Sequence, residues 1–197
     1  MVEEFAGRFP QSALLSYVYT QGARACQQKA DIEGVVSYGE KSLKLDPDNI
    51  YSMLILSLTL AQPHRQDPAA EGAQRLNPAR QYADRSLILL DTLKKPEGET
   101  EEDFLRRKAA LSADAHVALG TVEMQTNETA KAIQDFKTAI SLSANPNPQL
   151  YFRMGEIYEN EGENTKALEA FSQAAKLGAG SPLGDRAQQR AQNLTAH

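Results

Sequence analysis

The chain has 197 residues, a net charge of −5 and a single cysteine. The acidic balance disfavours a nucleic-acid partner, because binding to phosphates normally needs a basic surface, and one cysteine excludes an internal disulfide. The most apolar stretch, residues 50–61, is shorter than the about 20 residues that a membrane-spanning helix requires, so no membrane span is expected.

The first two predicted helix pairs span residues 16–49 and 50–93. The second pair opens with an apolar helix over 50–62, and an inserted loop over 63–76 is expected to follow. Asn77-Pro78 then predicts the start of its second helix, because Asn is a favoured N-cap and Pro suits the first helical turn.

A further helical segment is predicted to extend the third pair at its N-terminal side. Residues 94–98 form a turn, and Glu99 or Thr100 opens a helix that runs to Gln125, which makes residues 99–112 an extension. Its basic cluster, Arg106-Arg107-Lys108, follows an acidic run. That order indicates a solvated helix face with ion pairs three and four residues apart rather than a phosphate site.

Two copies of one pattern follow at an interval of 35 residues, over 113–147 and 148–180. A fixed period in this range is typical of a solenoid of stacked helix pairs. A last helix over 182–194 carries one narrow apolar stripe and is expected to cap the array. The residues that keep the interval are Gly120 and Gly155, Ala132 and Ala167, and Phe136 and Phe171.

The pattern resembles the tetratricopeptide repeat family, in a bacterial type of about four repeats. A glycine at repeat position 8, small residues at 20 and 27, an aromatic at 24 and a proline near 32 carry the resemblance. It extends to residues 16–49, which end in the family's signature at Pro47, although Gly39 stands where an aromatic is expected. The resemblance implies an all-α fold, an α–α superhelix of about four helix pairs plus a C-terminal capping helix, as one array over 1–197.

The resemblance also implies a concave groove lined by the first helix of each pair. The family's clamp for the C-terminal carboxylate of cytosolic chaperones is not matched, because only Arg153 agrees with it. A protein or peptide segment of another kind is therefore the expected partner. The candidate partner-binding residues are Tyr17, Arg24, Tyr51, Leu54, Leu58, Val117, Phe152 and Arg153.

The helix over 50–62 raises a separate question, because it is apolar on all sides. Met53 and Leu56 supply one packing face, whereas Leu54 and Leu58 lie on another. A helix of this kind is expected to be covered everywhere. One alternative is internal cover by an inserted segment or by the extended helix. The other is an exposed patch that receives a helix or an extended peptide of a partner.

No set of residues in the sequence predicts catalysis, a cofactor or a metal site. The three histidines lack ligand spacing, and His116 and Cys26 fall at core positions where packing is the expected role. The glycines are scattered singly, so no phosphate loop is expected. Asn127, in a triplet of glycosylation type, is predicted to be a helix N-cap.

The sequence therefore favours a non-enzymatic scaffold that binds a peptide or helix of a partner protein. The alternative is a structural segment of a larger bacterial envelope or enzyme assembly. Phe9-Pro10-x-Ser12 favours it, because this motif resembles one that precedes a new helix in tetratricopeptide proteins of bacterial envelopes, and the chain is expected to begin in mid-array. Residues 1–10 contain no signal-peptide core, so a cytoplasmic location and export after loss of a signal both stay open, as does the oligomeric state.

Overall fold

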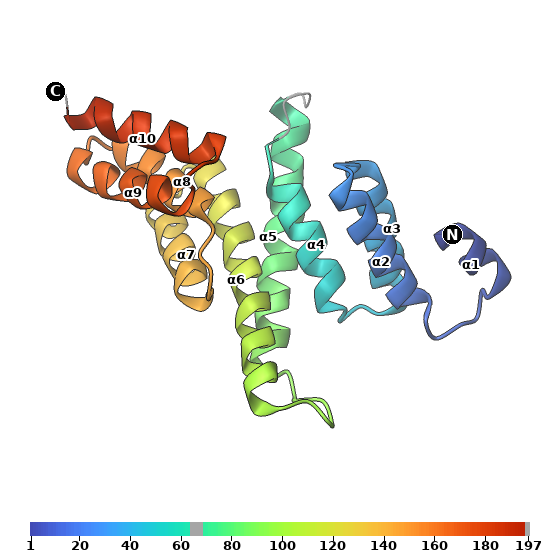
Figure 1. Cartoon of the computed structure of the whole chain (residues 1–197). Helices are drawn as coiled ribbons and strands as arrows, with labels where there is room; N and C mark the ends of the chain where they lie inside the picture. The colour runs from blue at the N-terminus through green and yellow to red at the C-terminus, as the bar shows by residue number, and fades with distance from the viewer. Residues whose placement is uncertain (64–68, 196–197) are drawn as a thin grey trace. The chain divides into compact units, whose positions relative to one another are not determined.

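The computed structural model describes residues 1–63 and 69–195, and within them the chain is all-helical, with no strand (Figure 1). Two compact units divide the chain, Met1–Val122 (unit 1) and Glu123–His197 (unit 2), and each is described by itself. The helices in chain order are α1 (Val2–Arg8), α2 (Leu15–Gln28), α3 (Ile32–Leu45), α4 (Ile50–Ala61), α5 (Ala69–Asp91), α6 (Glu101–Gln125), α7 (Thr129–Leu142), α8 (Pro148–Asn160), α9 (Asn164–Leu177) and α10 (Pro182–Thr195).

Polar side chains mark where several of these helices begin. Asn49 accepts a hydrogen bond from the amide of Ser52 at 3.0 Å ahead of α4, and Thr100 accepts one from the amide of Asp103 at 3.1 Å ahead of α6. These side chains replace the partners that the first amides of a helix lack. α6 is 25 residues long and begins at Glu101, well ahead of the third repeat.

The second helix of the second pair begins earlier than predicted. α5 starts at Ala69 rather than near Asn77, and Pro78 lies inside it. The predicted loop over 63–76 is therefore wrong for its last eight residues, 69–76, while residues 64–68 lie outside the described part of the chain.

Packing explains why α5 continues through Pro78. A proline inside a helix costs about 3 kcal/mol or more, because it lacks an amide donor and crowds the preceding turn. α5 nevertheless packs along α4, and its small residues Ala79 and Ala83 are fully buried. We infer that this tertiary packing offsets the local cost, which a capping rule applied to the sequence does not take into account.

The N-cap predicted at Asn127 is also wrong. Asn127 has a φ of 62°, in the left-handed region, and Glu128 stands at the cap position of α7. Asparagine adopts this conformation more readily than most residues do, because its short polar side chain bonds locally. Asn127 therefore makes the turn before the helix rather than capping it.

Unit 1 contains a buried network of hydroxyl groups where α2, α3 and α4 meet. Ser42 of α3 lies at its centre, with its Oγ 3.0 Å from those of Ser16 and Thr20 and 2.9 Å from that of Ser52. Thr20 and Ser52 are also 2.8 Å apart. Because Thr20, Ser42 and Ser52 are buried, their hydroxyls bond to one another, and those of Thr20 and Ser42 also have the backbone carbonyl of Ser16 within hydrogen-bond distance.

Ser42→Ala is expected to destabilise the chain by about 0.5–1.5 kcal/mol, because it removes one hydrogen bond from each of the buried hydroxyls of Thr20 and Ser52, which keep only their bond to each other and that of Thr20 to the Ser16 carbonyl. Chemical denaturation followed by circular dichroism measures the change. Ser37→Ala, at an exposed position of the same helix, is the matched control and should change the stability little. Equal effects of the two substitutions would rule out a stabilising role for the network.

The centre of unit 2 is a close approach between α8 and α9. A Cβ atom added to Gly155 would lie 2.7 Å from the ring of Phe171, so only glycine fits there. The ring centroids of Phe152 and Phe171 are 5.3 Å apart in an edge-on arrangement, which is favourable for aromatic pairs. Gly155 and Phe171, which both belong to the pattern that recurs every 35 residues, thus pack directly against each other within one repeat.

The C-terminal helix α10 packs on α9 through small residues. Gly184 of α10 approaches the backbone at Gly178, where an added Cβ atom would lie 2.2 Å from the carbonyl oxygen. Ser181 caps the helix by accepting a hydrogen bond from the amide of Gly184 at 3.2 Å. Gly184 and Ala187 are the buried residues of α10, and most of its exposed side chains are polar.

Candidate partner-binding surfaces

The first helices of the two pairs in unit 1 expose aromatic side chains at matching positions. Tyr17 of α2 is 62% exposed and Tyr51 of α4 is 39% exposed. The two helices contact each other, and the hydrogen bond between Thr20 and Ser52 joins them close to both tyrosines. Arg24 is exposed two turns after Tyr17, on the same face of α2.

The extension of α6 brings an arginine to Tyr51. Arg107 donates to both carboxylate oxygens of Glu99, at 2.9 and 2.7 Å, and its guanidinium lies 5.5 Å from the ring centroid of Phe104. Glu99 is the main cause that raises the pKa of Arg107, and Tyr51 adds to the effect. We name Tyr17, Arg24, Tyr51 and Arg107 the tyrosine surface.

The basic cluster of α6 therefore has two roles, of which the sequence predicted one. Arg106 forms ion pairs with Glu102 and Asp103, four and three residues before it, as expected of a solvated face. Arg107 instead pairs with Glu99, eight residues before it and ahead of the helix. No helical spacing rule predicts that contact, because it depends on how the chain enters α6.

Acid is expected to weaken the contribution of this ion pair to stability. Arg107 holds the pKa of Glu99 below its usual value, so the pair stabilises the fold above the unfolded-state pKa of about 4.3 and loses its effect as the pH falls through the lower folded-state value. The difference in thermal midpoint between the wild type and Glu99→Gln should shrink as the pH falls. Glu97→Gln, at an exposed position that forms no ion pair within the described part of the chain, is the control, and a difference independent of pH would refute the assignment.

Leu54 was predicted to line the groove, and that prediction is wrong in this structure. Its side chain is 3% exposed and belongs to a cluster with Ile50, Leu90, Leu111 and Ala115. Leu90 comes from α5, which lies beside α4 (Figure 1), and Leu111 comes from the α6 extension. The chain itself thus covers this side of the apolar helix.

Leu58 and Val117 occupy intermediate positions in unit 1. Both are half-buried, and Leu58 packs on the cluster of Ala83, Ala118 and Leu119. Leu58 thus contributes mainly to the packing of α4 against α5 and α6. Part of each side chain remains accessible, so both stay candidates for partner contact.

Phe152 in unit 2 was also predicted to line the groove, and it is buried instead. It is 2% exposed, and it lies between the ring of Phe171 and the guanidinium of Arg186, which is 5.0 Å from the Phe152 ring centroid. Because α10 supplies Arg186, the terminal helix covers the side of α8 that the repeat pattern assigns to the groove. Phe152 therefore acts in packing rather than in partner contact.

Arg153 belongs to a group of charged side chains between α8 and α10. Burial lowers the pKa of the half-buried Arg153, and Glu156 opposes that effect. Burial likewise raises the pKa of Glu156, against the influence of Arg190 and Arg186. Arg190 also pairs with Glu159. The alternating charges neutralise one another, so this face of α8 is polar without a large net charge.

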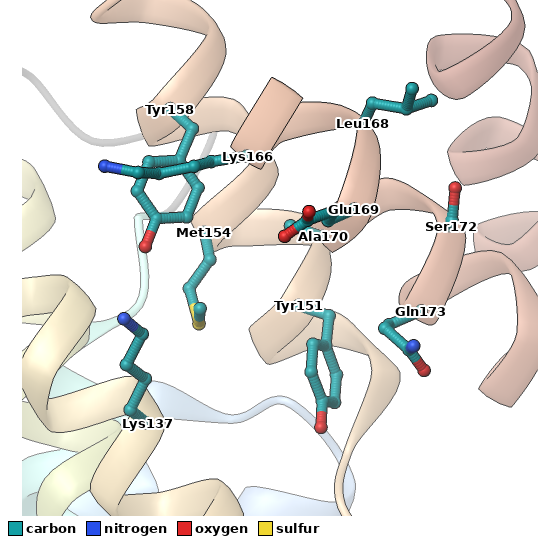
Figure 2. A pocket seen from close by; sticks show the side chains of 10 residues that line it. All are labelled: Lys137, Tyr151, Met154, Tyr158, Lys166, Leu168, Glu169, Ala170, Ser172 and Gln173. Carbon is teal, nitrogen blue, oxygen red and sulfur yellow. The ribbon is translucent and has the colours of Figure 1, made fainter. Parts of the chain in front are cut away.

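A pocket of about 670 Å³ lies in unit 2 between α7, α8 and α9 (Figure 2). The repeat pattern of the sequence did not predict this pocket, because its floor consists of repeat positions that normally form the core. Its lining residues are Lys137, Tyr151, Met154, Tyr158, Lys166, Leu168, Glu169, Ala170, Ser172 and Gln173.

The remaining polar candidates do not assemble into a catalytic site within the described residues. Burial, with Asp31 close by, raises the pKa of the Cys26 thiol, which keeps the thiol protonated and unreactive at neutral pH. His116 is half-buried. Residues 1–63 and 69–195 contain no group of three or more His, Cys, Asp or Glu side chains placed to hold a metal ion. Over the same ranges, no helix combines the length and the apolar character needed to cross a membrane.

Residues 113–146 and 148–177 match the family model of the tetratricopeptide repeat. Solved structures share the fold: a crystal structure of MamA protein (19% identity, 94% of this chain, 88% of that chain, TM-score 0.57) and a thermophilic TPR protein of Thermus thermophilus (16% identity, 100% and 88% covered, TM-score 0.63). A second MamA structure is 21% identical, covers 88% of this chain and 92% of that chain, and has a TM-score of 0.53. No curated protein matches the sequence.

Residues 113–146 and 148–177 are tetratricopeptide repeats, and the fold class of the chain is the α–α superhelix. This fold indicates a protein–protein interaction scaffold with protein partners, a class that is generally non-enzymatic. The family match covers the third and fourth helix pairs. The earlier pairs, with the long α5 and the extended α6, depart further from the repeat pattern.

Proposed function

We propose that the chain is a non-enzymatic scaffold that binds a peptide or helix of a partner protein on the tyrosine surface of unit 1. The observation that carries this proposal is the exposure of Tyr17 and Tyr51 at matching places on neighbouring helices. Tyrosine and arginine are enriched at the energetic centres of protein interfaces, because they offer large contact areas with polar ends. Arg24 and Arg107 supply the arginines.

The two arginines suit a partner segment that carries acidic or carbonyl groups beside apolar side chains. Arg107 is already held in place by Glu99, so little side-chain freedom is lost when a partner binds. Leu58 and Val117 add half-exposed apolar area to the same unit. Arg153, in unit 2, remains a proposed contact for a polar group of the partner.

Site-specific photo-crosslinking tests this proposal without a known partner. A photoreactive phenylalanine analogue replaces Tyr17 or Tyr51 in the full chain, and a control replaces Glu33, which is exposed on α3. When cells that naturally produce the protein are illuminated, both tyrosine positions should crosslink to the same single protein. The Glu33 position should crosslink to none. The same products from all three positions, or none from the tyrosines, would refute the proposal.

The captured partner then allows a quantitative test. Tyr17→Ala combined with Tyr51→Ala should weaken its binding at least about tenfold, because aromatic interface centres commonly contribute more than 1 kcal/mol each. Isothermal titration calorimetry measures the affinity, and circular dichroism verifies that the double variant is folded. If the double variant bound the partner with unchanged affinity, the partner would bind to another surface of the protein.

A further inference from the structure

The pocket of unit 2 lies on a different face of α8 from the charged residues near α10. Tyr151, Met154 and Tyr158 are spaced three and four residues apart and share one side of the helix. Phe152 and Glu156 share another, which α10 covers. The pocket therefore offers unit 2 a binding face that its terminal helix leaves open.

The floor of this pocket is apolar. Met154, Tyr158 and Ala170 are each largely buried, and they line the pocket together with the half-buried ring of Tyr151. Figure 2 shows Met154 between the rings of Tyr158 and Tyr151. A volume of about 670 Å³ is within the range of binding clefts and accommodates several side chains of a partner.

The charged groups around this floor are separated by sign. In Figure 2, Lys137 and Lys166 lie at the left of the view with the hydroxyl of Tyr158, whereas Glu169 lies nearer the centre. Lys166 is held by an ion pair with Glu163 and lies 5.5 Å from the ring centroid of Tyr158. Lys137 and Glu169 are exposed and take part in no ion pair among the described residues.

The floor of this pocket differs from the equivalent positions of the preceding repeat. The residues 35 positions before Tyr151, Met154 and Tyr158 are His116, Leu119 and Glu123. The preceding repeat therefore has an acidic group where the pocket has a tyrosine ring and hydroxyl.

We propose that this pocket docks a short segment of a partner protein whose central apolar side chain is flanked by one acidic and one basic side chain. The apolar side chain covers Met154, the acidic group pairs with Lys137 beside the Tyr158 hydroxyl, and the basic group pairs with Glu169. A segment with only acidic groups is repelled by Glu169, and one with only basic groups is repelled by Lys137, so the selectivity follows from complementary charge. This docking surface is independent of the tyrosine surface.

Labelled synthetic peptides that carry a leucine between two charged residues test the proposal on the full chain. Three compositions are compared by fluorescence anisotropy: one glutamate and one lysine, two glutamates, or two lysines, each at several spacings. The wild type should bind the mixed peptide about fivefold more tightly than either of the others, because each exposed ion pair contributes modestly. A mixed peptide with serine in place of leucine should bind more weakly still.

Charge reversal at the rim makes the test specific to this pocket. Glu169→Lys should shift the preference to the peptide with two glutamates, and Lys137→Glu should shift it to the peptide with two lysines. Both residues are exposed, so the fold is expected to persist, and Lys176→Glu, on α9 outside the pocket, should leave the preference unchanged. The proposal would be overturned if none of the peptides bound, or if neither charge reversal altered the preference among them. The crosslinking experiment at Tyr17 and Tyr51 tests the tyrosine surface separately, so its outcome does not depend on the peptide measurements.

Discussion

Leu54→Ala is expected to lower the free energy of unfolding by about 2–5 kcal/mol, because a buried leucine that is truncated in a packed cluster leaves a cavity. Leu54 lies in one buried cluster with residues from α4, α5 and the α6 extension. A loss of this size would show that this cluster contributes strongly to the stability of unit 1. Urea denaturation followed by circular dichroism provides the measurement.

Leu105→Ala serves as the matched control for this prediction. Leu105 is an exposed leucine of the α6 extension, and its truncation should change the stability by less than about 0.5 kcal/mol. If Leu54→Ala were as mild as Leu105→Ala, the cover of α4 by the α6 extension would be wrong. Leu54 would then be a surface residue, as the groove pattern of the repeat family predicts.

Phe171→Ala is expected to destabilise unit 2 by about 3–5 kcal/mol, the usual range for a buried phenylalanine. Its ring fills the space that Gly155 leaves open, contacts Phe152 edge-on and lies under the guanidinium of Arg190, 5.3 Å from the ring centroid. Truncation therefore removes contacts to α8 and α10 together. Hydrogen exchange of the α8 and α10 amides, measured with global unfolding, should show both helices losing protection.

Leu177→Ala, at an exposed position near the end of the same helix, is the control for Phe171→Ala. It should leave the protection of α8 and α10 unchanged. Loss of protection in α8 alone after Phe171→Ala would show that α10 does not depend on this aromatic core. Because Phe171 keeps the interval-35 pattern with Phe136, the result also reports on the role of the repeat itself.

The repeat period predicted the helix pairs because it records contacts within and between neighbouring helices. Gly155 and Phe171 are conspicuous in the sequence for the same reason that they pack together in the structure. The long α6 was predictable as well, since no residue after Thr100 breaks the helical pattern before Gly120, which the repeat requires. Local signals of this kind need no knowledge of distant contacts.

The candidate site was less predictable, because the groove positions of the repeat family are defined for an array of regular repeats without added helices. In such an array Leu54 and Phe152 face open space, whereas here the α6 extension and α10 cover them. The contact of Arg107 with Glu99 and Tyr51 depends on the entry into α6, which has no repeat counterpart. The candidates that remain exposed are Tyr17 and Arg24 of α2 and Tyr51 of α4.

These differences divide the residues of α4 into two roles. Leu54 holds α5 and α6 against the helix, and Tyr51, less than one turn earlier, remains exposed beside Arg107. The apolar character of the helix thus serves the fold of this chain, and we propose that partner binding involves its aromatic and charged neighbours. A partner that bound Leu54 directly would have to displace the α6 extension first.

The reactivity of single cysteines along α4 tests this division most directly. In a Cys26→Ser background, Tyr51→Cys and Leu54→Cys are treated with a thiol-reactive reagent under native conditions, and each folded fraction is measured by circular dichroism. The account predicts fast labelling at position 51 and protection at position 54 until the chain unfolds. Equally fast labelling of both positions in the folded chain would contradict it, because Leu54 would then be part of an open groove.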